Sequence, residues 1–191
     1  MPNKPTFIDF TDEDREAFIS EIGQEVERGS DRAVVLLGAA MVDEVLKRTL
    51  RQFFADVSST EELLEGGPSA PLGSFSARIK IAEALGLIAP AEAKIMDSIR
   101  TIRNDYAHRL AGEIDTAAVS DKLASRRATI NKWIAEAKVS IAEEDNFGMA
   151  YAKMCISAIL FLVKRFSWID RIKRPTRPEM VLIKSKTTKN E

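Results

Sequence analysis

The residues best suited to chemistry lie in one hexapeptide, Arg103-Asn104-Asp105-Tyr106-Ala107-His108, within a helical pattern. His108 is the only histidine in the 191 residues, and histidine is the side chain whose ordinary pKa allows proton exchange near neutral pH. Arg103, five residues earlier, adds a permanent planar cation suited to phosphate. If this protein performs acid–base chemistry, we expect it at this hexapeptide.

The helix that carries the hexapeptide is expected to begin at Pro90, a favoured first helical position, and to reach about Leu110. At about 100° per residue, one apolar stripe forms from Ile95, Ile99, Ile102, Tyr106 and Leu110. Arg103 lies at the edge of this stripe, whereas Asn104 and His108 lie on the opposite, polar face. Arg103 and His108 are about 140° apart around the axis and about 7.5 Å apart along it. Two copies of the helix, antiparallel across a twofold axis, could bring both groups onto one ligand, so we expect a homodimer.

Composition places the chain among ordinary globular proteins with one domain. Hydrophobic residues make up 45% and charged residues 30%, and the formal net charge is −1. A dedicated nucleic-acid-binding protein usually carries a clear basic excess, so the overall balance argues against one, although a local patch escapes that average. Direct binding to DNA or RNA would show a steep loss of affinity with salt.

The single cysteine and the shortness of the apolar runs exclude disulfide-bonded, zinc-binding and membrane-spanning classes of protein. Cys155 is the only cysteine, so no intrachain disulfide or cysteine-rich zinc site can form, and we expect no metal and no cofactor. Its apolar, helix-spaced neighbours predict a buried, inert thiol. The first residues lack the apolar core of a signal peptide, and the longest apolar run, residues 156–163, is far shorter than the roughly 20 residues of a membrane span. We therefore expect a cytoplasmic protein with no membrane segment.

Helical periodicity dominates the chain, and no alternating strand pattern of useful length appears. The expected fold is an all-α, single-domain bundle of about six helices within residues 1–170. A loop or bent hairpin is expected at 56–74, where glycine and proline cluster. Thr11 and Asp14 indicate a capping box at the first helix, and Gly86 indicates a C-terminal cap. The helices are expected at 12–28, 32–54, 75–85, 90–110, 115–142 and 145–168.

Residues 171–191 form a basic C-terminal tail. They contain seven Lys or Arg and two Glu, a net charge of +5, together with a short apolar group at 180–183. One interpretation is a solvated, frayed terminus. The other is an arm that contacts a partner or an anionic surface.

The second expected helix is apolar around most of its circumference at residues 33–42, which is typical of a central, buried helix. Asp43 and Glu44 interrupt this pattern. A buried acid without a partner is costly, so we expect a charged partner for at least one of them. The structural interpretation of the hexapeptide assigns that role to Arg103, in an ion pair with Asp43 or Glu44.

A second candidate site lies at residues 71–75. Ser74 is expected to cap the following helix, and a helix N-terminus is a ready anion site. Arg78 and Lys80 follow within two turns and could flank a bound anion. The alternative is a simple capped turn with both cations on a solvated face.

Three segments, in order, resemble the MltR family, which is named for the mannitol operon repressor. They are residues 30–46, beginning Ser-Asp-Arg-Ala-Val-Val-Leu-Leu-Gly; residues 71–88, beginning Pro-Leu-Gly-Ser-Phe-Ser-Ala-Arg; and residues 99–108. The resemblance implies an all-helical transcriptional regulator that acts mainly through protein partners and has no enzymatic activity of its own.

The hexapeptide also resembles the Arg-x4-His pattern of HEPN domains, with polar Asn104 directly after the arginine. HEPN domains are helical bundles, and many are metal-independent ribonucleases whose site forms where two motifs meet across a dimer. This resemblance implies a catalytic set of Arg103, Asn104 and His108. His108 would handle protons at the ribose 2′-hydroxyl or the leaving oxygen, and Arg103 would neutralise charge on the phosphate.

Overall fold

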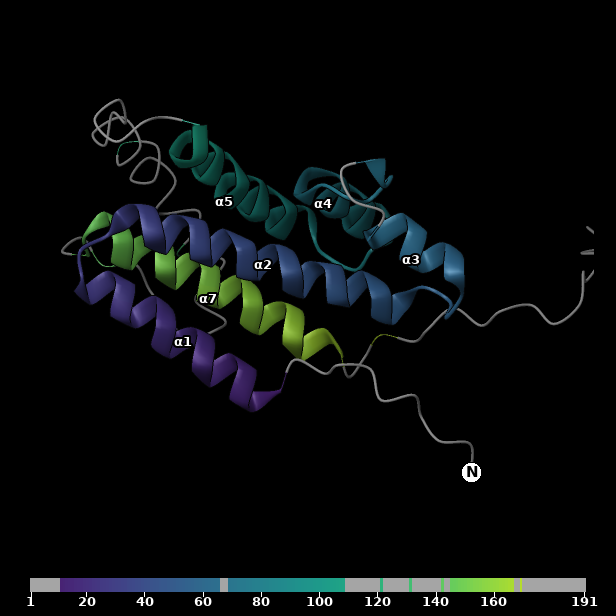
Figure 1. Cartoon of the computed structure of the whole chain (residues 1–191), viewed down its shortest axis with the longest axis horizontal. Coiled ribbons are helices and arrows are strands. Elements are labelled where there is room, and N and C mark those ends of the chain that lie inside the picture. The colour runs from purple at the N-terminus through teal and green to yellow at the C-terminus, as the bar shows by residue number, and fades with distance from the viewer. Residues whose placement is uncertain are drawn as a thin grey trace, which may run out of the picture.

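The computed structural model describes residues 11–65, 69–108 and 145–166, together with the single positions 121, 131, 142 and 169. Within the described part the chain forms helices and turns and no strand, which confirms the all-α class (Figure 1). The helices are α1 (Asp12–Glu27), α2 (Asp31–Phe53), α3 (Ser58–Glu65), α4 (Phe75–Ala84), α5 (Pro90–His108) and α7 (Phe147–Phe166). Of the helix expected at 115–142, the structure describes only positions 121, 131 and 142, of which the first two are helical, and the tail at 171–191 lies outside the described residues.

Local capping chemistry sets the helix ends, as the sequence predicts. Thr11 and Asp14 form the reciprocal capping box of α1. Ser30 caps α2 by accepting a hydrogen bond from the backbone N–H of Ala33. Gly86 directly follows the C-cap of α4 with φ +72°, a conformation that glycine adopts without steric cost.

The expectation of a loop across 56–74 is wrong, because helix α3 occupies Ser58–Glu65. Tertiary contacts stabilise this short helix. Its Leu64 side chain is buried in the core, and the Thr60 hydroxyl donates to the carbonyl of Ala55 at 2.6 Å. Arg51 of α2 also pairs with Glu61 and Glu65. An isolated helix of eight residues is only marginally stable, so the sequence of this segment alone does not clearly predict a helix.

Helix α2 is the centre of the bundle, with α1, α4, α5 and α7 around it (Figure 1). One side of α2 is buried along its whole length, as expected for a central helix. The opposite side is more open, since Leu36 remains 37% exposed. At Gly38 the backbone of α2 comes so close to α7 that an added Cβ would lie 2.9 Å from the Cys155 sulfur. The missing side chain therefore sets the spacing between α2 and α7.

Helices α2 and α7 run parallel (Figure 1), and their first turns are in contact. The Gly148 N–H at the start of α7 donates to the carboxylate of Asp31, the first residue of α2. Asn146 caps the same end by accepting from the N–H of Met149 at 2.8 Å. Helix α1 precedes α2 by a tight turn at residues 28–30 and runs antiparallel to it (Figure 1).

Helix α7 is the core helix opposite α2. Its stretch Phe147–Arg165 is long and apolar enough to pass a membrane-span test by length and composition, and 56% of that stretch is buried inside the fold. Tyr151, Met154 and Leu162 are fully buried there. The apolar character of α7 is thus accounted for by packing against α2, α1 and α5.

Candidate functional site

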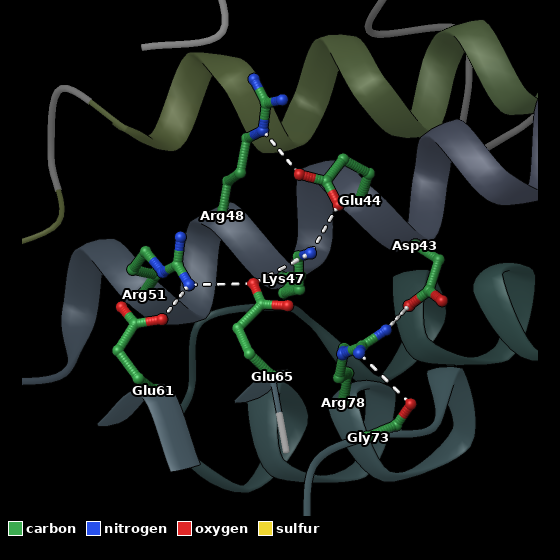
Figure 2. Close-up of polar contacts among 9 residues, drawn as sticks. All are labelled: Asp43, Glu44, Lys47, Arg48, Arg51, Glu61, Glu65, Gly73 and Arg78. Carbon is green, nitrogen blue, oxygen red and sulfur yellow. Dashed lines mark hydrogen bonds and ion pairs between the residues drawn. The ribbon is translucent and has the colours of Figure 1, made fainter. Parts of the chain in front are cut away.

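Residues from the three segments 30–46, 71–88 and 99–108 approach one another at an ion pair that is mostly buried. Arg78 of α4 donates through Nη1 to Oδ1 of Asp43 on α2 at 2.7 Å, and through Nη2 to the Gly73 carbonyl at 3.2 Å (Figure 2). Only 8% of Arg78 is exposed. One guanidinium therefore ties the turn before α4 to the middle of the central helix.

The prediction that Arg103 pairs with Asp43 or Glu44 is wrong. Asp43 pairs with Arg78, and Glu44 pairs with Lys47 at 2.8 Å and Arg48 at 2.9 Å. Lys47 and Arg48 lie one turn further along α2 and reach Glu44 without any tertiary contact. The expectation that the acids on α2 need charged partners is confirmed, but the cations come from other positions.

Arg103 lies near this ion pair and not within it. Its Nη1 donates to Oδ1 of the adjacent Asn104 at 3.1 Å, and the residue is half-buried. Burial raises the pKa of Asp43, and the positive charges of Arg78, Arg103 and Lys47 lower it only in part. Arg103 thus stabilises the Asp43 carboxylate from a distance, while its guanidinium stays at the edge of the packed core.

Ion pairs continue along α2 to α3. Glu65 pairs with both Lys47 at 3.1 Å and Arg51 at 2.9 Å, and Arg51 also reaches Glu61 at 2.6 Å (Figure 2). The cross-helix pairs were not predicted, because no local spacing in the sequence indicates them. The two glutamates are largely exposed, so each pair contributes little stability and mainly orients α3.

The second predicted site is only partly assembled. Ser74 caps α4, because its Oγ accepts from the Ala77 N–H at 3.2 Å, so the predicted cap is confirmed. Arg78 is committed to Asp43 and the Gly73 carbonyl. Lys80 lies exposed, two residues and therefore about 200° further around α4. Arg78 and Lys80 thus do not flank one anion. The capped turn is confirmed, but the expectation that both cations lie on a solvated face is wrong for Arg78, which is buried.

The apolar stripe of the hexapeptide helix is confirmed, since Ile95, Ile99, Ile102 and Tyr106 are all buried. The ring of Tyr106 stacks on Phe147 at 5.6 Å between centroids, and Phe147 stacks in turn on Tyr151 at 6.1 Å. The Tyr151 hydroxyl donates to the Ile99 carbonyl at 3.2 Å. Leu110, the last residue of the expected stripe, lies outside the described residues. His108 is the last residue of α5, and its side chain also lies outside the described part.

The two tyrosines should respond oppositely to loss of the hydroxyl. Tyr106 is only 2% exposed, and its hydroxyl meets no hydrogen-bond partner in the described part of the chain. Burial, followed by the charge of Asp31, raises its pKa to about 12. We expect Tyr106→Phe to raise the free energy of unfolding by about 1 kcal/mol, because a buried unpaired hydroxyl is costly.

The matched variant Tyr151→Phe should lower the free energy of unfolding by about 1 kcal/mol, because it removes the bond to the Ile99 carbonyl. Urea denaturation of both variants measures the difference. A loss of stability in Tyr106→Phe equal to that in Tyr151→Phe would show that the Tyr106 hydroxyl has a partner.

Cys155 is a buried free thiol, as predicted. Its complete burial raises the pKa of the thiol well above its ordinary value, so the reactive thiolate is suppressed. Among the described residues, no group of three or more His, Cys, Asp or Glu side chains is placed to hold a metal ion.

Comparison with known proteins gave no relative. No family model, no curated protein and no solved structure matched this chain.

Proposed function

We propose that this chain is an MltR-like transcriptional regulator, similar to the mannitol operon repressor, which acts mainly through protein partners and has no enzymatic activity of its own. We place it in the cytoplasm as a homodimer. One observation carries the proposal: Asp43 from the first MltR-like segment and Arg78 from the second form the buried ion pair, and Arg103 from the third lies close enough to influence Asp43. The polar residues of the three segments thus support the fold, as a binding scaffold requires.

The physical argument concerns what Arg78 is able to do. Its guanidinium donates to a carboxylate and to a backbone carbonyl, and it is almost fully buried. A cation in this state holds helices together and has little freedom to bind substrate. The resemblance at 71–88 is therefore best understood as a packing motif that positions the outer surfaces for a partner.

The regulator proposal is tested in cells that lack the chain. We expect transcription initiation to change at a small set of promoters, measured by sequencing of RNA 5′ ends. Full restoration is expected from the wild-type chain and equally from His108→Ala, because no proton transfer is involved. Unchanged promoter activity in the deletion strain would contradict the proposal.

The alternative is a HEPN-type, metal-independent ribonuclease with a composite site at the dimer interface. One observation supports the ribonuclease alternative: Arg103 does not pair with Asp43 or Glu44. It donates instead to Asn104, the polar residue that follows the arginine in the HEPN-like pattern. Arg103 and Asn104 from each subunit, together with His108, would form such a site.

Incubating purified protein with RNA in the presence of a metal chelator tests this alternative. A ribonuclease should lose about 10²- to 10⁴-fold of its cleavage rate in His108→Ala, the usual contribution of a general acid or base. Arg103→Lys should lose activity while keeping the charge. Equal background cleavage by wild type and His108→Ala would exclude the ribonuclease.

A further inference from the structure

Helix α1 carries the strongest charge of the described helices. Its 16 residues include seven acids and one base, Arg15, which gives a net charge of −6. The next most negative described helix, α3, is half as long and carries a net charge of −3, and the remaining described helices are neutral or positive. The acids are Asp12, Glu13, Asp14, Glu16, Glu21, Glu25 and Glu27.

Only one side of α1 is covered by the bundle. Phe18 and Ile22 are buried against the core, and Val26 is half-buried on the same side. Ile19, a large apolar side chain that is 39% exposed, lies where the buried side of α1 meets the exposed side, one turn from Glu16. The exposed acids Glu13, Asp14 and Glu21 lie further around the helix. Figure 1 shows α1 at the edge of the bundle, with α2 and α7 on one side of it. The outer face of α1 therefore combines negative charge with one exposed apolar side chain at its border with the core.

The same chain contains a segment of complementary composition. Residues 171–191 carry seven Lys or Arg and two Glu, and the apolar group Met-Val-Leu-Ile at 180–183 divides the basic positions into two sets. The net charge of +5 nearly balances the −6 of α1. Both features of the outer face, the acids and Ile19, thus have a counterpart in this segment.

The described residues that precede 171–191 lie close to the beginning of α1. Since α2 and α7 start together and α1 runs antiparallel to α2, the end of α7 at Phe166 lies beside the beginning of α1 (Figure 1). Ile169 packs against the core, so the chain is still held to the bundle two residues before position 171. Twenty-one residues span at most about 70 Å when extended, whereas the 16 residues of α1 are about 24 Å long.

We propose that residues 171–191 dock on the outer face of α1 of the same chain. The basic side chains lie along the acids, and the apolar group at 180–183 covers Ile19. Single surface ion pairs contribute little, but tethering gives the segment a millimolar effective concentration at the face, so a set of weak contacts is sufficient. An anionic ligand of the basic segment must then compete with α1 for it. This inference does not depend on the proposed function.

The fluorescence anisotropy of a dye on the tail of the full-length chain tests the proposal. Ser185→Cys keeps every charge and adds a thiol for labelling, while the native thiol of Cys155 is buried. We expect high anisotropy in low salt. It should fall between about 0.1 M and 1 M salt, as the Debye length falls from about 10 Å to about 3 Å.

Neutralising the outer face of α1 should release the tail without added salt. The variant Glu13→Gln, Glu16→Gln, Glu21→Gln should show the high-salt anisotropy already in low salt. The matched control Glu62→Gln, Glu83→Gln changes exposed acids of α3 and α4 and should behave like the wild type. Circular dichroism establishes that the helix content of each variant is the same.

A polyanion provides a second readout. A heparin oligosaccharide should bind the triple variant several-fold more tightly than the wild type or the control, because α1 no longer competes for the basic segment. Equal affinity together with unchanged anisotropy in the triple variant would overturn the proposal. Anisotropy that rises with added unlabelled protein would also overturn it, since the tail would then dock on a second copy.

Discussion

Arg78→Met is expected to lower the free energy of unfolding by about 3 kcal/mol, the usual cost of removing one partner from a buried ion pair. The variant leaves the half-buried Asp43 carboxylate without its direct partner and removes a donor from the Gly73 carbonyl. Methionine keeps most of the apolar volume, so the loss reports the polar contacts. Urea denaturation followed by circular dichroism at pH 7 measures it.

Two further variants isolate the ion pair. The double variant Asp43→Asn, Arg78→Met should recover part of the lost stability, because the buried charge is removed with its partner. Arg48→Met serves as the matched control, since it removes a cation from the more exposed Glu44 and should cost about 0.5 kcal/mol. If Arg78→Met lowers the free energy of unfolding by no more than Arg48→Met does, the ion pair between Arg78 and Asp43 has no special structural role.

The same variants should differ in their response to pH. Burial raises the pKa of Asp43 above its ordinary 3.8, so the folded state binds this proton more readily than the unfolded state. The contribution of Asp43 therefore becomes more favourable as pH falls through the folded pKa towards 3.8. In Arg78→Met the pKa should rise further, which extends this gain to higher pH. The difference in stability between Arg78→Met and the double variant, measured from neutral to acidic pH, should shrink as pH falls.

Gly38→Val is expected to lower the free energy of unfolding by about 3 kcal/mol, the upper end of the usual range for overpacking a core. Even the first added carbon would lie 2.9 Å from the Cys155 sulfur and 3.3 Å from the Tyr151 ring. Both neighbours are fully buried, so neither can move aside without shifting α7. Thermal and urea denaturation report the loss.

Two controls separate overpacking from helix propensity. Gly23→Val in α1 adds the same side chain where no atom lies within 4 Å of the new Cβ, and it should change stability by no more than about 0.5 kcal/mol. Cys155→Ala should recover part of the loss in Gly38→Val by clearing the closest atom. Equal costs at Gly23 and Gly38 would show that α2 and α7 are not closely packed there.

The sequence specified the local structure well. Thr11 with Asp14, Ser74, Gly86 and Pro90 mark helix ends through contacts within four residues, and such contacts depend on chain order alone. The apolar stripe of α5 and the buried thiol of Cys155 likewise follow from helical periodicity. The missed helix α3 is the exception, because a short helix depends on what it packs against.

The candidate site depended on the tertiary structure. The sequence predicted a charged partner for at least one of Asp43 and Glu44, and it pointed to Arg103 as that partner. Arg78 became the partner because α4 packs across the middle of α2 and brings together residues 35 positions apart. The close approach of α7 to Gly38 was equally unpredictable from the sequence, because it depends on which turn of α7 faces that glycine. The sequence by itself determined the helices, the capped ends and the need for charge compensation, because these are set by neighbours along the chain. Only the tertiary structure decided which charges meet, because helix packing sets distances that chain order does not encode.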